Sequence, residues 1–140
     1  MELSYQLFDF LHLDCKMIRE RVFMQEQGFQ NEFDNIDDTA LHIVVYADNK
    51  PAATGRLYCE SGEWHIGRIA ALPEYRGCSL GSMVVTELEK AGTSRGVKFI
   101  SLSAQCRAAG FYEKLGYAQT DDLHDDEGCP HVTMVKELKI

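Results

Sequence analysis

The sequence contains no cysteine arrangement that would form a disulfide framework or a zinc site. Its cysteines are scattered, odd in number and without a C-x-x-C pair: Cys15, Cys59, Cys78, Cys106 and Cys129. Disulfide-rich domains and structural zinc sites both need paired or closely spaced cysteines. We therefore expect reduced thiols, no bound metal and a reducing, cytoplasmic environment.

Long apolar runs are also missing from the chain. No stretch approaches the roughly 18 apolar residues of a membrane span, and no basic flank opens the sequence as it would a secretory signal. Both absences predict a cytoplasmic protein without a membrane partner.

Basic residues are scarce relative to acidic ones. The chain has 14 lysines and arginines against 22 aspartates and glutamates, which leaves a net charge of −8. A nucleic-acid partner needs a concentrated basic surface, so this balance argues against DNA or RNA binding. It does not exclude a small anionic cofactor held by local backbone amides and a single arginine.

The remaining composition is that of one globular domain. The chain has 140 residues, of which 45% are hydrophobic and 26% charged, and it shows no internal repeat, linker or low-complexity tract. We therefore predict a single domain over residues 1–140. The sequence leaves open whether that domain forms a homodimer.

Apolar patterning and turn residues predict an alternation of strands and helices. The expected strands are residues 3–8, 41–47, 52–59, 64–71, 97–103, 117–120 and 131–137, and the expected helices are 13–27, 80–94 and one around Phe111. Residues 29–39 are expected to form a loop or short helix, and residues 121–128 an acidic loop. The strand–helix–strand order over 64–103 implies a parallel pair of strands.

The most informative segment is the one in which the strand 64–71 leads through a basic turn into the helix 80–94. The turn, R-G-C-S-L-G, spans residues 76–81 and is called the 76–81 loop below. A helix N-terminus directs unpaired N–H groups and its positive dipole end toward such a turn. The pattern predicts a phosphate or pyrophosphate site.

Two motifs at family spacing resemble those of the GCN5-related N-acetyltransferases (GNAT superfamily). The 76–81 loop resembles the R/Q-x-x-G-x-G/A pyrophosphate loop, and residues 108–117 resemble the segment A-x-x-F-Y-x-K-x-G-F/Y. The resemblance implies an α/β (α+β) fold with a mixed, mostly antiparallel sheet of about six or seven strands. It also implies about four flanking helices and a parallel strand pair that splays apart to admit acetyl-CoA.

The resemblance assigns a set of residues to the coenzyme. Backbone groups of Ile69 and Ala71 are expected to pair with the pantetheine arm, and the 76–81 loop with the pyrophosphate. The full set is Ile69, Ala70, Ala71, Arg76, Gly77, Cys78, Ser79, Leu80, Gly81, Ser82, Phe111, Tyr112 and Lys114. One residue departs from the motif: Ser79 replaces its middle glycine, which is costly if that position requires a positive φ.

Tyr112 is the residue expected to protonate the leaving thiolate, as the matching tyrosine does in the resembling family. The base that deprotonates an attacking amine is less defined. His65 is a candidate because strand alternation places residues 65, 67, 69 and 71 on one face. Glu26, near the end of the first helix, is a second candidate.

Four further short matches resemble the ElaA/YjcF branch of the superfamily, which shows V-F-V-x-E-Q, D-x-D-x-x-A-x-H, L-x-A-Q and G-x-P-H-x-x-M. The matches lie here within residues 21–28, 32–42, 102–105 and 128–134. The branch resemblance makes Glu26, Gln105 and His131 candidates for the acceptor site. Arg68 is expected on the strand face opposite His65, as a structural ion-pair partner.

These patterns together predict a transfer of acetyl from acetyl-CoA to a primary amine of a small molecule or peptide, by direct attack in a ternary complex. Two alternatives stay open. One is a non-catalytic acyl-CoA sensor; the other is an acetyltransferase for aminosugar phosphates of the glucosamine 6-phosphate type. The second needs a basic acceptor pocket, for which Arg56, Arg68 and Arg107 are the candidates.

Overall fold

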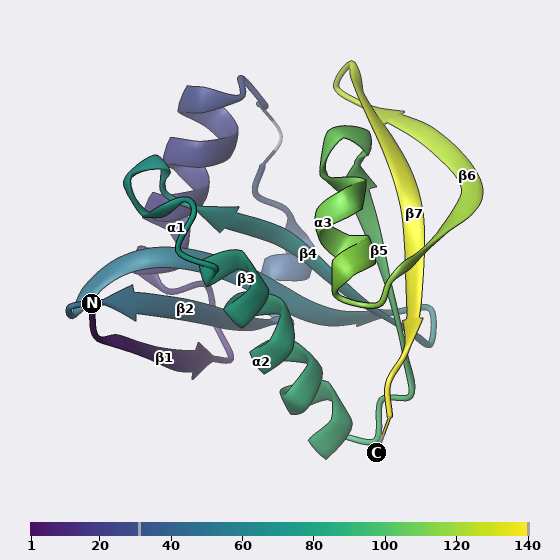
Figure 1. Cartoon of the computed structure of the whole chain (residues 1–140), viewed down its shortest axis with the longest axis horizontal. Helices are drawn as coiled ribbons and strands as arrows, with labels where there is room; N and C mark the ends of the chain where they lie inside the picture. The colour runs from purple at the N-terminus through teal and green to yellow at the C-terminus, as the bar shows by residue number, and fades with distance from the viewer. Residues whose placement is uncertain (31, 140) are drawn as a thin grey trace.

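A computed structural model describes residues 1–30 and 32–139 of the chain and contains one seven-stranded mixed sheet (Figure 1). The strand order is β1-β2-β3-β4-β5-β7-β6, and β4–β5 is the parallel pair. The strands are β1 (Leu3–Phe8), β2 (Leu41–Ala47), β3 (Lys50–Glu60), β4 (Glu63–Ala71), β5 (Phe99–Gln105), β6 (Ala118–Asp126) and β7 (Cys129–Glu137). The α-helices of this described part are α1 (Leu13–Arg19), α2 (Leu80–Ser94) and α3 (Ala109–Lys114). The predicted strand number is confirmed, with three α-helices in place of about four.

Two buried clusters cover the two faces of the sheet. The larger one joins α2 to the sheet through Leu80, Val84 and Leu88, and Figure 1 shows α2 crossing in front of β2 and β3. The smaller one joins α1 to the other face through Cys15 and Ile18, which are fully buried. Burial of these apolar side chains on both faces fixes the two helices against the sheet.

Two segments differ from the sequence-based expectation. The first helix continues past α1 as a π-helical segment, Glu20–Glu26, and ends at Gly28, whose φ of +81° only glycine adopts readily. The expected acidic loop 121–128 is instead mostly strand, because β6 extends to Asp126 and pairs with β7 down to Cys129. Its acidic side chains are exposed, so acidity there marks a solvated strand and not a loop.

A bulge in β4 shapes the functional region. Arg68 has a φ of +52°, and the register between β3 and β4 shifts at this point. The extra residue reverses the alternation: Ile66 and Ile69 both pack toward α2, whereas Ala70 packs toward α1. The expectation that residues 65 and 69 share a face is therefore wrong.

Beyond the bulge, β4 and β5 separate. The two strands share a single register position, His65 opposite Ser101, and then diverge toward their C-terminal ends (Figure 1). β5 continues its pairing on the other side, with β7. The parallel pair is thus open at the end that leads into the 76–81 loop.

Candidate active site

The 76–81 loop has the left-handed backbone that a glycine-rich turn requires. Gly77 has a φ of +82° and Ser79 a φ of +62°. Ser79 is the N-cap position of α2, but its hydroxyl makes no capping hydrogen bond with the first turn. A serine in this conformation costs about 1–2 kcal/mol relative to glycine. The replacement of the motif glycine by Ser79 therefore carries a conformational cost in the folded state.

Phe111 links the loop to α3. A Cβ placed on Gly81 would lie 3.2 Å from Cζ of the Phe111 ring, so glycine at this position lets the ring approach the first turn of α2. The ring, Ala71 and the loop residues together line a cavity of about 370 Å³ in front of the α2 N-terminus. The loop and the F-Y segment, distant in sequence, therefore form one site.

Arg76 and Glu26 form an ion pair at the entrance of the site. Both guanidinium NH groups of Arg76 donate to the Glu26 carboxylate at 2.6 Å, and both side chains are exposed. Hydrogen bonding from Arg76 lowers the pKa of Glu26 below its ordinary value. A carboxylate with a lowered pKa is a weaker base, which disfavours Glu26 as the group that deprotonates an amine.

A cleft of about 300 Å³ occupies the opening between β4 and β5, and we call it the β4–β5 cleft. Its walls come from the helical segment 22–29, from β4, from β5 and from the β6–β7 hairpin. The side chains discussed below that line it are Gln27, Glu32, Arg68, Ile69, Arg76, Ser103, Gln105, Arg107, Tyr112 and His131.

The backbone of β4 presents unpaired groups to this cleft. The N–H of Leu72 donates to the carbonyl of Ala52, which precedes the β3 partner of Ala71. The backbone N–H and C=O groups of even-numbered residues near the end of β4 therefore point toward β3. By alternation, the N–H and C=O groups of Ile69 and Ala71 point toward β5, which has already diverged. These groups are free to pair with an extended amide-containing ligand in the manner of an added strand.

Tyr112 contributes a phenol to the cleft wall. Its ring packs edge-on against Phe111 and Tyr117, at centroid distances of 4.9 and 6.1 Å. Burial raises the pKa of Tyr112 to about 12. Among the described residues, none hydrogen-bonds to its hydroxyl, which leaves that group available to a ligand.

Gln105 and His131 meet on the opposite wall. Gln105 donates to Gln27 Oε1 at 2.9 Å and accepts from Arg107 Nε at 2.8 Å, which ties β5 to the helical segment. His131 is 7% exposed, and its Nδ1 lies 2.8 Å from the Cys129 carbonyl. A carbonyl only accepts, so Nδ1 carries the proton and the neutral ring keeps its lone pair on Nε2.

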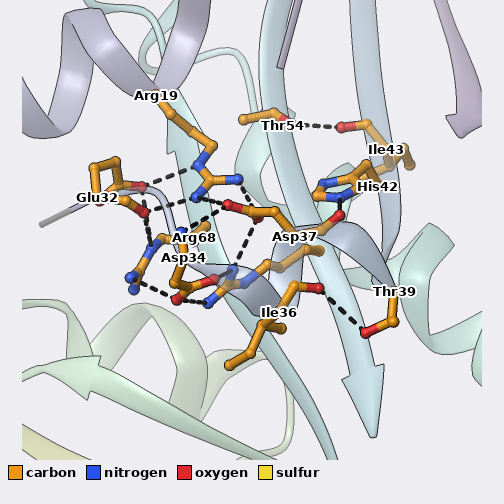
Figure 2. A network of polar contacts seen from close by, with 11 residues as sticks. Arg19, Glu32, Asp34, Ile36, Asp37, Thr39, His42, Ile43, Thr54 and Arg68 are labelled. Carbon is orange, nitrogen blue, oxygen red and sulfur yellow. Dashed lines mark hydrogen bonds and ion pairs between the residues drawn. The ribbon is translucent and has the colours of Figure 1, made fainter. Parts of the chain in front are cut away.

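A buried ionic network lies behind the β4 bulge (Figure 2). Arg19, which is 1% exposed, donates to Glu32 at 3.0 Å and to Asp37 at 2.7 Å, and Figure 2 shows it between these two carboxylates. Arg68 lies 3.1 Å from Glu32 and 3.5 Å from Asp34. The network anchors the side chain of the one β4 residue with a positive φ, and therefore supports the bulge from which the strands diverge.

The ion-pair role expected for Arg68 is confirmed, but its expected face is not. With the bulge, its side chain points to the α1 side of the sheet, toward the acidic residues of segment 32–37. Arg56, a candidate for a basic acceptor pocket, is 3% exposed and paired with Asp34 and Asp37. It therefore lies in the network and does not line the cleft.

Two predicted site residues, His65 and Lys114, lie away from both the cleft and the 76–81 loop. His65 stacks on Tyr58 at 5.2 Å, at the closed end where β4 and β5 still pair. Lys114, the last residue of α3, lies beside Leu115 and Lys136, whereas Phe111 of the same helix lines the loop cavity. Glu32 and Gln27 line the cleft but were missed as site residues. Gln27 is the last residue of the V-F-V-x-E-Q match, from which only Glu26 was taken as a candidate, and Glu32 lies in the segment 29–39, which was expected to be a loop or short helix.

The described residues 1–30 and 32–139 contain no group of three or more His, Cys, Asp or Glu side chains arranged to hold a metal. Within the same described part, no helix is both long and apolar enough to cross a membrane.

The structure has a mixed sheet with one splayed parallel pair of strands, a helix N-terminus at the open end of that pair, and a cleft between the two strands. These features define an acyltransferase-type fold. A model of the acetyltransferase (GNAT) domain matches residues 14–138. The chain therefore belongs to the GNAT acetyltransferase family and is an acetyltransferase. This outcome confirms the family resemblance drawn from the two motifs.

Individual relatives agree with this placement. YjcF of Bacillus subtilis, described as an uncharacterized N-acetyltransferase, is 35% identical over 127 residues, with 89% of this chain and 91% of YjcF covered. A crystal structure from Lactobacillus plantarum superposes with a TM-score of 0.88 at 28% identity, covering 99% of this chain and all of that one. Escherichia coli ElaA, at 22% identity, shares the fold with a TM-score of 0.86 over 97% of this chain and 100% of its own.

Proposed function

We propose that the protein transfers an acetyl group from acetyl-CoA to a primary amine of a small molecule or peptide, within a ternary complex. One observation carries this proposal: β4 and β5 share a single register position and then leave the backbone of Ile69 and Ala71 unpaired in a lined cleft. The cleft opens toward the N-terminus of α2, where N–H groups favour a phosphate. The residues present therefore fit an extended coenzyme whose phosphates lie at the loop.

Acetyl-CoA, when bound, supplies a thioester that an amine attacks. The chain's own contribution is mainly alignment: the 76–81 loop and β4 backbone hold one substrate, and the opposite wall holds the other. The name of the relative YjcF supports an amine as the acceptor.

Tyr112 is proposed to donate a hydrogen bond to the leaving sulfur. Full proton transfer from a phenol of pKa about 12 to a thiolate whose thiol has a pKa of about 8.5 is uphill by about 5 kcal/mol. A hydrogen bond avoids that cost and still stabilises negative charge on the sulfur as it develops. The proton that the thiolate finally takes is then the one that the amine releases, passed on by the base that first accepts it.

His131 is proposed as the group that accepts the amine proton. It lines the cleft, and its Nε2 carries the lone pair because Nδ1 is bonded to the Cys129 carbonyl. His65 is less suited, since it lies at the closed end of the strand pair against Tyr58. Gln105 and Gln27 are proposed to orient the acceptor, and the reduced cysteines suggest a cytoplasmic setting.

The aminosugar-phosphate alternative keeps partial support. Arg68 and Arg107 line the cleft, but Glu32 lies in the same wall and Arg56 is paired within the network. A phosphorylated acceptor would have to compete with these carboxylates, so an uncharged or cationic amine is favoured.

Calorimetric titration with acetyl-CoA, followed by thiol release against a panel of amines, aminosugar phosphates and lysine peptides, tests the proposal. Binding with amine-dependent thiol release is the expected result. Binding without release by any amine would favour the sensor alternative, and absence of binding would contradict the proposal.

A further inference from the structure

A relay of polar side chains links β5 to β6 beside the cleft. Ser103 Oγ lies 2.7 Å from His124 Nε2, and His124 Nδ1 lies 3.7 Å from Asp122 Oδ1. The other Asp122 oxygen accepts a hydrogen bond from Thr133 Oγ1 at 2.7 Å. A hydroxyl, an imidazole and an oriented carboxylate therefore follow one another in that order.

The sheet register places these groups on one face. β7 lies between β5 and β6, with Thr133 opposite Ser103 and His131 opposite His124. The rings of His124 and His131 stack with a centroid distance of 5.8 Å. The relay is therefore continuous with the wall that carries His131.

The order of groups is that of an activated serine. A serine hydroxyl becomes a nucleophile when an imidazole within about 2.6–3.2 Å takes its proton and a third group orients the ring. With the Ser103 hydroxyl donating to Nε2, the ring proton lies on Nδ1, on the side of Asp122. The 3.7 Å separation from Asp122 is an ion-pair distance that shortens if the imidazole becomes charged.

Ser103 also lies where a thioester would be. It lines the β4–β5 cleft together with Ile69 and Tyr112, two positions beyond Ser101, the last β5 residue opposite β4. A coenzyme arm that enters past Ala71 and runs along β4 would bring its far end toward this closed part of the cleft. This placement rests on the proposed function.

We propose that Ser103, His124 and Asp122 form a second acyl-transfer centre, which hydrolyses acetyl-CoA when no amine is bound. Ser103 Oγ forms an ester bond with the acetyl carbon, the carbon–sulfur bond breaks, and the hydroxyl proton passes through His124 to the thiolate. Water then attacks the ester, gives a proton to His124, and the carbon–oxygen bond to Ser103 breaks. The proton returns to Oγ, and the products are free coenzyme thiol and acetic acid, which loses its proton to the solvent as acetate.

The first test needs no coenzyme. The full chain is treated with phenylmethylsulfonyl fluoride, and the modified residue is identified by peptide mass mapping. Labelling at Ser103 that falls about 10²-fold in His124→Gln, with unchanged thermal stability, is expected from loss of the general base. Labelling that is absent, or equal in His124→Gln, overturns the proposal.

The second test follows thiol release from acetyl-CoA without any amine, with acetyl-CoA affinity measured calorimetrically in the same samples. Ser103→Ala should lose this amine-independent release, and the calorimetric affinity reports separately whether the variant still binds acetyl-CoA. Ser101→Ala, on the same strand and face, is the matched control and should behave as the wild type. Release by Ser103→Ala at the wild-type rate, or no release by a wild type that binds acetyl-CoA, overturns this inference and leaves the proposed function standing. A failure to bind acetyl-CoA overturns both.

Discussion

Replacing Ser79 by glycine should make the protein more stable. Ser79 has a φ of +62°, which costs a residue with a Cβ about 1–2 kcal/mol. Glycine removes this cost, while its greater freedom in the unfolded chain offsets about 0.5–1 kcal/mol. The net gain in the free energy of unfolding should be about 0.5–1 kcal/mol, or a melting temperature higher by about 2–4 °C in a domain of this size.

Two variants separate backbone strain from side-chain capping. The same change at Ser82, inside α2, should lower stability by about 0.5–1 kcal/mol. At this helical position glycine relieves no backbone strain and adds only its conformational entropy cost. Ser79→Ala should be nearly neutral, since the Ser79 hydroxyl caps nothing. Scanning calorimetry of the three variants tests this account of Ser79. A lower melting temperature for Ser79→Gly, or a free energy of unfolding lowered by about 1 kcal/mol in Ser79→Ala, would refute the reasoning.

Three further predictions concern the network and the cleft. Arg19→Met should lower the free energy of unfolding by about 3–5 kcal/mol in urea titrations, because it leaves the buried carboxylates of Glu32 and Asp37 without this ion-pair partner. The control Arg21→Met, which breaks an exposed ion pair with Glu74, should lower it by less than about 1 kcal/mol. Burial pushes the pKa of Asp37 up, but hydrogen bonding and charge from Arg19 hold it below its ordinary value. The stabilisation is therefore present above about pH 4 and lost as pH falls through the lower folded pKa, so Asp37→Asn should show a weaker acid dependence than the wild type, and an identical dependence would contradict this. Tyr112→Phe should lower kcat about 10²-fold with unchanged acetyl-CoA affinity, whereas Tyr117→Phe, whose hydroxyl instead bonds Glu89, should keep kcat; equal effects would argue against the phenol's role.

The parts of the fold that follow local rules were predictable from the sequence. Apolar periodicity placed α2, and the family resemblance assigned both the 76–81 loop and the F-Y segment to the coenzyme. The close approach of Phe111 to Gly81 shows that the two segments lie side by side. The requirement for a positive φ at Ser79 was foreseen as a condition and is met in the backbone.

The parts that depend on a single irregular residue were not predictable. Simple alternation along β4 placed His65 with Ile69, and the bulge at Arg68 reverses that relation. No local signal marks an arginine as a bulge residue, because the ion pairs that hold it come from Glu32 and Asp34, more than 30 positions away. Long-range pairing therefore decides which side chains enter the cleft.

The acidic hairpin shows a second limit of local reasoning. Residues 121–126 are acidic and lack apolar alternation, yet they form β6, because β7 supplies the backbone partners of an edge strand. This strand brings His124 within reach of Ser103. A site formed across β5, β7 and β6 cannot be read from the spacing of its residues.

The most direct test of the central claim is backbone-amide NMR during titration with acetyl-CoA. If the coenzyme occupies the β4–β5 cleft, the largest shift changes should fall on Ile69, Ala71, Gly77 and Gly81, with one molecule bound per chain. Amides such as that of Phe99, in the groove at the N-terminal ends of β4 and β5, should change little. Changes concentrated at Phe99, or no saturable change at Ile69 and Gly81, would contradict the account.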